Sequence, residues 1–444
     1  MNTDGLHPLD AIRASAIRLD DNDGDYDALL DATASCSIVM LGGATRGTAE
    51  FAHMRDAITR RLIVEQGFDA VAVEADWPDA WRVHRYVCGD SHDADAGEAL
   101  GDFAHFPGWP WRNTVAPAFI EWLQRYNALR DPVAKVGFHG LDSYSLYRSA
   151  RAAIRCLEQI DPEQAELARE HYAVLDHVRD PQRYGYEAAA SLQPACREAV
   201  LRCLTEQLAA APAYPPRDGY NGTQAPFFAA RQAQAVASAA AYYQSMLGTR
   251  QARWNLREYH MTQTLFALQA HLRECGRPGR IVVWSHNASV GDARGTQAGH
   301  AGEWSMGQLA RKRAGAAAML VGFTTSGGQL CAAHAWDGEP ERMALRSPRT
   351  DSYEALFRRT RLERFYLPLH GASPAVVRRP MLQRSVGVLY RPDAEFECHY
   401  VSATLAQQFD AVFHLDQTTE LPPLPAGWSG EAGDPGYLPM RPWR

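Results

Sequence analysis

Several features that mark common classes of protein are missing from this chain of 444 residues. Its eight cysteines are scattered and form no Cys-x-x-Cys pair, so neither a zinc ribbon nor a disulfide framework is indicated. The formal charge of −7 argues against non-specific binding to nucleic acid, which needs a basic surface. No apolar run reaches the roughly 18 residues that a membrane span needs, so we expect no membrane association. The N-terminal residues MNTDGLHPLD do not resemble a secretory signal, and we therefore expect a cytoplasmic protein.

Motifs of the commonest enzyme sites are missing as well. The chain has no Gly-x-Ser-x-Gly nucleophile elbow, no Gly-Lys-Ser/Thr phosphate loop and no His-Glu-x-x-His helix. The usual serine hydrolases, P-loop proteins and zinc proteases are therefore not indicated.

What the sequence does contain is an alternation of strand-like and helical stretches, typical of parallel βαβ units. The apolar runs lie at 37–42, 69–74, 135–139, 280–284, 318–325, 330–335, 386–390 and 411–415. A helix is expected at 11–19. We predict a single α/β domain, residues 1–444, with a parallel-sheet core flanked by helices.

The core is predicted to comprise residues 37–149 and 276–416. Between these parts, residues 150–275 have an almost continuous helical pattern, which indicates a large all-helical insertion that covers the cleft. In its last helix Met261, Leu265, Leu268 and Leu272 fall on one face. Residues 417–444, rich in Pro and Gly, are expected to form a C-terminal tail that wraps the surface.

One stretch, SIVMLGGATRGTAEF at 37–51, joins a buried strand to a helix through a glycine turn. Such a turn lies at the carboxyl edge of a parallel sheet, where α/β proteins place ligands. The glycines let the chain turn sharply and leave room beside the backbone. Because parallel strands end at one edge, the turns at 42–47, 74–77 and 286–289 should converge, with 140–144 as a plausible fourth.

The chain resembles the erythromycin esterase family, in which the first turn reads Gly-Glu-x-x-His-Gly and is followed by Glu-Phe. The resemblance continues, in order, through DAVAVEADWPDAWRV (69–83), WPWRNT (109–114), KVGFHGLDSYSLYRS (135–149), RWNLREYHM (253–261), VVWSHNASVGDAR (282–294), LVGFTT (320–325) and VGVLYRP (386–392), and ends in 399–416. It therefore covers nearly the whole chain.

This resemblance implies a metal-free hydrolytic site at the carboxyl edge. In the family a histidine of the first turn acts as the base on water, supported by two glutamates, a helix arginine and later histidines. Glu74, Arg55 and His286 match that pattern. The first glutamate is replaced by Gly43 and the turn histidine by Arg46, and Ser289 stands where the family has a second later histidine.

The replacement of the turn histidine changes the chemistry that we expect. Arginine has five donors and no acceptor, and its pKa is ordinarily above about 12, so Arg46 is suited to hold an oxygen rather than to take a proton. Loss of a general base typically costs about 10²–10⁴-fold in rate. His286, oriented by Glu74, is one replacement base; a histidine new to the site, such as His139, His53 or His84, is another.

The residues that we predict to form the site fall into two groups. The catalytic candidates are Glu74 and His286, and the substrate-binding candidates are Arg46, Arg55, Trp77, His139 and Ser289. The alternative role for Arg46 is an ion pair with Glu74 or Glu50, and Asp142, Tyr144, Asn255, Arg257 and His260 are expected to be structural. Zinc normally takes three or four protein ligands, and the edge offers one acid and one histidine, so we predict no metal and no cofactor.

Three functions remain open for a small-molecule substrate. The first is a non-hydrolytic acid/base step, such as cyclisation, elimination or rearrangement, on a polyketide-like secondary metabolite. The second is metal-independent hydrolysis of a carboxylic ester or lactone, such as a macrolide, with His286 as the base. The third is non-catalytic binding of a small molecule. The sequence leaves the oligomeric state open.

Overall fold

An eight-stranded sheet forms the centre of the computed structural model, which describes residues 6–103, 107–143, 248–370 and 373–425 and isolated positions between 158 and 241. In sheet order the strands are β1 (Ile17–Arg18), β9 (Arg364–Pro368), β12 (Ala411–Leu415), β6 (Ala318–Thr325), β2 (Ile38–Leu41), β5 (Ile281–Trp284), β3 (Ala70–Asp76) and β4 (Gly137–Asp142). From β12 to β4 all neighbours are parallel, whereas β9 and β1 pair in antiparallel fashion. The predicted α/β fold with a mostly parallel sheet is confirmed.

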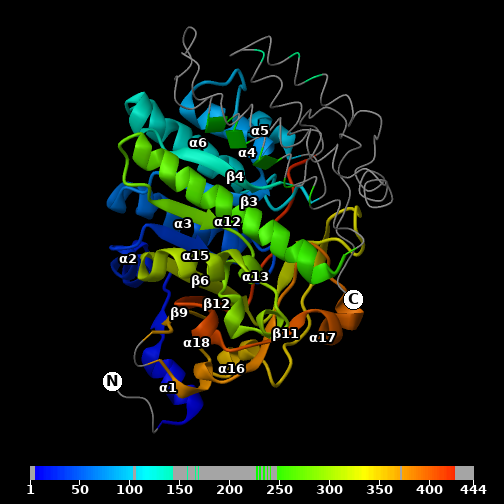
Figure 1. Cartoon of the computed structure of the whole chain (residues 1–444). Coiled ribbons are helices and arrows are strands. Elements are labelled where there is room, and N and C mark those ends of the chain that lie inside the picture. The colour runs from blue at the N-terminus through cyan, green and yellow to red at the C-terminus, as the bar shows by residue number, and fades with distance from the viewer. Residues whose placement is uncertain are drawn as a thin grey trace.

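Helices cover both faces of this sheet (Figure 1). One face carries α2 (Asp27–Thr33), α3 (Ala49–Gln66), α4 (Trp77–Cys88) and α6 (Ala116–Ala128), and the other carries α1 (Pro8–Ser15), α12 (Arg250–Glu274), α15 (Met306–Ala314) and α16 (Tyr353–Arg358). Side chains alternate between these layers, since Val39 and Leu41 pack on the first and Ile38 and Met40 on the second. Every residue of β2 is therefore buried, as expected for a strand between two layers.

Shorter elements surround the carboxyl edge. The short helices are α5 (Ala96–Ala99), α13 (Asn287–Val290), α14 (Gln297–His300), α17 (Glu395–Cys398) and α18 (Leu405–Gln408). Two antiparallel pairs join β7 (Gln329–Ala332) to β8 (Glu341–Ala344) and β10 (Met381–Arg384) to β11 (Tyr400–Ala403). None of the helices in the described part of the chain is long and apolar enough to cross a membrane.

Two predicted elements are wrong. Residues 386–390 do not form a strand. Val386 directs its N–H to Ala44 and its carbonyl to the His286 side chain, and the rest of the segment forms only an isolated bridge with Ala333. The helix expected at 11–19 ends at Ser15, because the next residues form β1 and pair with β9.

The last helix of the predicted insertion, α12, packs directly on the sheet. Met261, Leu265, Leu268 and Leu272 are all buried and belong to one apolar cluster with strand residues of β2, β3 and β5. Figure 1 shows α12 running across this face beside α15. Most of the remaining insertion, its predicted role as a lid, Tyr144 and the tail beyond 425 lie outside the described residues.

Candidate functional site

The carboxyl ends of β2, β3, β4 and β5 meet around the side chain of Glu74. The pairing of β3 with β4 shifts register between Val73 and Asp76, and this irregularity lies at Glu74. The Glu74 side chain is completely buried. Because a buried carboxylate is costly unless it is paired and hydrogen-bonded, its partners define the site.

Both carboxylate oxygens of Glu74 are saturated with donors. Oε1 accepts hydrogen bonds from Arg46 Nη2 and, at 2.5 Å, from Arg257 Nη2. Oε2 accepts from the Ser285 hydroxyl and, at 3.0 Å, from the His286 backbone N–H. Burial raises the pKa of Glu74, but the two arginines and Ser285 outweigh it and hold the pKa well below the ordinary value. Glu74 is thus a fixed negative charge.

Arg257 of α12 extends the ion pairs to β4. Its Nε and Nη2 donate to Asp142 Oδ2 at 2.9 and 2.6 Å, and its side chain is 6% exposed. Arg257 and the next residue, Glu258, lie at the helical spacing of the buried apolar stripe of α12, between Trp254 and Met261. A charged pair in an apolar stripe is a signal that sequence reasoning could have used to find them.

Arg46 and Arg55 present unused donors at this edge. Arg46 bonds to Glu74 and its side chain is 18% exposed, and Arg55 Nε donates to the Gly42 carbonyl at 2.8 Å. Within the described residues, Nε and Nη1 of Arg46 and both Nη groups of Arg55 have no hydrogen-bond partner. Burial and the neighbouring Arg46 lower the pKa of Arg55 to about 10, against the attraction of Glu74. Glu50 bonds to Thr419 rather than to Arg46.

Gly43 lacks a side chain where Arg55 lies. A Cβ atom at position 43 would fall 2.2 Å from Arg55 Nη2, far below van der Waals contact. The glycine that replaces the family glutamate is therefore matched to the present position of this guanidinium.

Both ring nitrogens of His286 are engaged by the backbone. Nδ1 accepts a hydrogen bond from the Ala288 N–H at 3.2 Å and caps α13, so the proton lies on Nε2, which donates to the Val386 carbonyl at 3.1 Å. Burial and Arg46 lower the pKa of His286 to about 4. His286 is therefore neutral near pH 7 and has no free lone pair in this arrangement.

Ser289 lies behind the site. It is fully buried and its hydroxyl donates to Glu258 Oε1 at 2.7 Å. Glu258 Oε2 accepts from the Met306 N–H at 2.7 Å, and burial raises the pKa of Glu258 to about 8. The structure does not bring Ser289 into contact with Arg46 or Glu74.

The remaining candidates, Trp77 and His139, stack on each other with ring centroids 5.7 Å apart. His84 lies 4.6 Å from His139 in the same aromatic group, which Phe228 extends through Trp77. Burial depresses the pKa of His139 well below its ordinary value. No described contact joins this group to Arg46 or His286, and His53 is exposed to solvent on α3.

A small cavity lies beside Arg55. It has a volume of about 30 Å³ and is lined by apolar side chains, among them Trp111, Phe119 and Trp284. Within the described residues no three His, Cys, Asp or Glu side chains gather so that they could hold a metal ion.

Comparisons with known proteins agree with this architecture. The family model of erythromycin esterase matches residues 63–418. Similar solved structures include a succinoglycan biosynthesis protein (18% identity, 94% of this chain and 97% of that one, TM-score 0.74) and a protein from Bacillus cereus (18%, 94% and 98%, TM-score 0.77). A mutant of the erythromycin esterase EreC in its open conformation is also similar (14%, 90% and 95%, TM-score 0.61). At these identities the likeness to solved structures concerns the fold.

Proposed function

The chain belongs to the erythromycin esterase family, and we propose that it uses the carboxyl-edge site of this fold for a non-hydrolytic step on a small molecule. In this step Arg46 and Arg55 hold a carbonyl or carboxylate oxygen and stabilise the negative charge that develops on it. Cyclisation, elimination or rearrangement of a polyketide-like metabolite has this requirement.

One observation carries the proposal: among the described residues of the site, Arg46 and Arg55 have free donors, whereas the acceptors of Glu74 and His286 are all engaged. The unpaired guanidinium nitrogens of Arg46 and Arg55 point to recognition of an anion or a polarised oxygen. Every acceptor position of Glu74 and the single lone pair of His286 are taken by hydrogen bonds. Proton transfer by either residue, including activation of water by His286 for ester hydrolysis, requires these bonds to open first.

The same observation also fits non-catalytic binding of an anionic small molecule, because free donors bind an oxyanion whether or not it reacts. Turnover separates the two candidates. A panel of lactones, esters and keto acids that includes erythromycin is incubated with the purified protein and followed by mass spectrometry. A product of unchanged mass but altered structure, or one that has lost a group without gaining water, supports the enzyme.

The role of the arginines is tested separately by calorimetric titration with carboxylates. Arg46→Met and Arg55→Met should each weaken binding by about 10- to 100-fold, since each removes a charge-assisted hydrogen bond. Arg61→Met on the same helix, whose partners are Glu65 and Asp27, is the matched control and should bind normally. A product heavier by one water would overturn the proposal and make His286 the base to examine.

A further inference from the structure

The backbone of Val386 touches both parts of the candidate site. Its N–H donates to the Ala44 carbonyl at 2.8 Å, in the turn that carries Arg46. Its own carbonyl accepts the Nε2–H of His286 at 3.1 Å. A shift of this one residue would therefore disturb the turn and the imidazole together.

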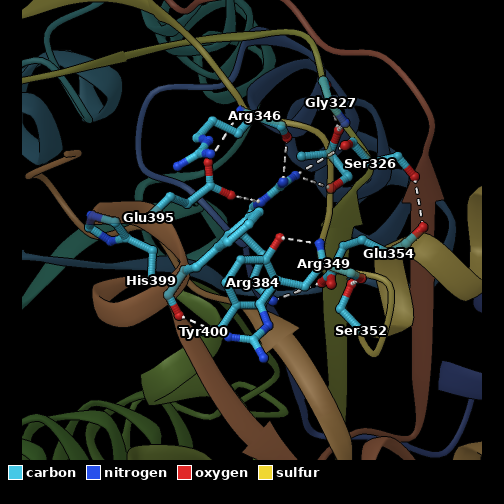
Figure 2. A network of polar contacts seen from close by, with 12 residues as sticks. Ser326, Gly327, Arg346, Arg349, Ser352, Glu354, Arg384, Glu395, His399 and Tyr400 are labelled. Carbon is cyan, nitrogen blue, oxygen red and sulfur yellow. Dashed lines mark hydrogen bonds and ion pairs between the residues drawn. The ribbon is translucent and has the colours of Figure 1, made fainter. Parts of the chain in front are cut away.

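Two residues before Val386, Arg384 enters a network of buried polar contacts (Figure 2). Its Nη1 donates to the carbonyls of Thr325 and Ser326, both at 3.1 Å, and its Nη2 donates to the Arg346 carbonyl at 2.6 Å. Its backbone N–H donates to Glu354 Oε1 at 2.9 Å. The end of β6 and the segment after β8 meet at the Arg384 side chain, and α16 meets its backbone.

Glu395 of α17 ties both ends of the segment 384–390. Its Oε1 accepts from Arg384 Nε at 2.9 Å, and its Oε2 accepts from the Tyr390 hydroxyl. The side chains of Arg384 and Glu395 are both 0% exposed. The segment that contains Val386 is thus held at both ends by one buried carboxylate.

We infer that Arg384, paired with Glu395, is a positioning residue of the candidate site, which holds Val386 where it orients His286 and the turn 44–46. A buried ion pair often contributes no more to stability than apolar residues of the same volume. What an apolar residue cannot replace is the direction of the bonds to Glu395 and to carbonyl groups in two parts of the chain, the end of β6 and the segment after β8. The inference relies on the proposed function for the location of the site.

The test uses the double variant Arg384→Met/Glu395→Gln, which removes both charges of the ion pair. Hydrogen exchange read by mass spectrometry should show segments 384–390 and 42–47 exchanging at least about tenfold faster. In histidine-labelled protein, nitrogen NMR should show His286 losing its fixed tautomer, because the Val386 carbonyl no longer holds the Nε2 proton in place. His286→Gln assigns the signal.

Arg311→Met/Asp410→Asn is the matched control, because this ion pair lies at the start of β12, away from the carboxyl edge. It should leave the His286 signal unchanged. Should the Arg384 double variant be poorly folded, Arg384→Lys keeps the charge but reaches fewer acceptors, and a smaller change in the same direction is expected. An unaltered His286 signal and unaltered exchange in a folded Arg384 variant would overturn the inference. None of these readouts needs a substrate, so they succeed or fail independently of the binding and turnover assays.

Discussion

Glu74 shows how the surroundings of one residue determine what it can do. As a buried carboxylate with four donors it balances Arg46 and Arg257 and is poorly suited to accept a further proton. Its neighbours Arg46 and Arg55 retain unused donors. The chemistry of the site therefore follows from how the hydrogen bonds are distributed as much as from which residues are present.

Replacing Glu74 by Gln should destabilise the protein by about 3 kcal/mol, because removing one member of a buried ion pair leaves the partner charge unpaired. Urea unfolding measures this loss. Glu65→Gln, at a half-exposed pair with Arg61 on α3, serves as the control and should change stability by less than about 0.5 kcal/mol. Equal losses in both variants would mean that Glu74 is not the charge that balances the site.

Gly43→Ala tests the close approach of Arg55. The added methyl group would displace the guanidinium and strain its bond to the Gly42 carbonyl, at a cost of about 1 kcal/mol. In an Arg55→Ala background the same substitution should cost less, and a double-mutant cycle of unfolding free energies measures the difference. Additive effects would contradict the contact. For the same reason, restoring a glutamate at position 43 requires Arg55 to move.

The sequence predicts some residues of the candidate site and misses others, and the difference has a physical reason. The strand-end turns, and with them Glu74 and His286, follow from the alternation of strands and helices. Arg257 was detectable as a charge in an apolar stripe. The pairing of Val386 with His286 spans a hundred residues of an irregular segment, and no periodic pattern encodes such a contact.

The helix α12 was expected to belong to an insertion that covers the cleft, but it packs directly on the sheet. Leu265 is completely buried against the sheet, whereas Tyr259 on the same helix is 51% exposed. Leu265→Ala should destabilise the protein by about 2–5 kcal/mol, as core truncations do, and Tyr259→Ala by less than about 0.5 kcal/mol. Thermal and urea unfolding both measure these losses of stability. If Leu265→Ala had as small an effect as Tyr259→Ala, α12 would lie outside the core.

The strands that the sequence predicts correctly are those of the central parallel sheet, such as β2, β5 and β6, because burial on both faces makes them continuously apolar. The missed strands, including β10 and β11, lie in a small antiparallel pair and are only partly buried. The false strand at 386–390 has the same apolar composition as a strand, but Val386 bonds to the site and the rest of the segment forms only an isolated bridge with Ala333.

For the whole molecule, the free energy of unfolding should have a maximum as a function of pH and fall on its acid and alkaline sides. His286 is neutral when folded, with a pKa lowered from 6.5 to about 4, so its contribution is present above pH 6.5 and is lost as the pH falls towards 4. Glu258 is protonated when folded, with a pKa raised from 4.5 to about 8, so its contribution is present below pH 4.5 and is lost as the pH rises to 8.

The contribution of His286 is on the order of 3 kcal/mol and that of Glu258 on the order of 5 kcal/mol. Urea unfolding across this range should show that His286→Gln flattens the acid limb and that Glu258→Gln flattens the neutral-to-alkaline limb. His53→Gln, at an exposed position, should leave the profile as it is. Profiles that do not respond to the two buried substitutions would contradict the assignment.

The arginine pair beside a saturated carboxylate has a consequence for whatever molecule binds there. Between about pH 5 and pH 7 the charges of His286 and Arg55 do not change, because the pKa of His286 is about 4 and that of Arg55 is about 10. Any pH dependence of affinity in that interval therefore reports the acidity of the ligand. A carboxylic acid is ionised throughout this interval and would bind with nearly constant affinity. A weaker acid, such as an enol, would bind more tightly as the pH rises. The affinity for a neutral lactone would stay constant until a group of the protein titrates. The binding profile of a crude metabolite extract would thus separate a weak acid from a carboxylic acid or a neutral molecule before the active component is purified.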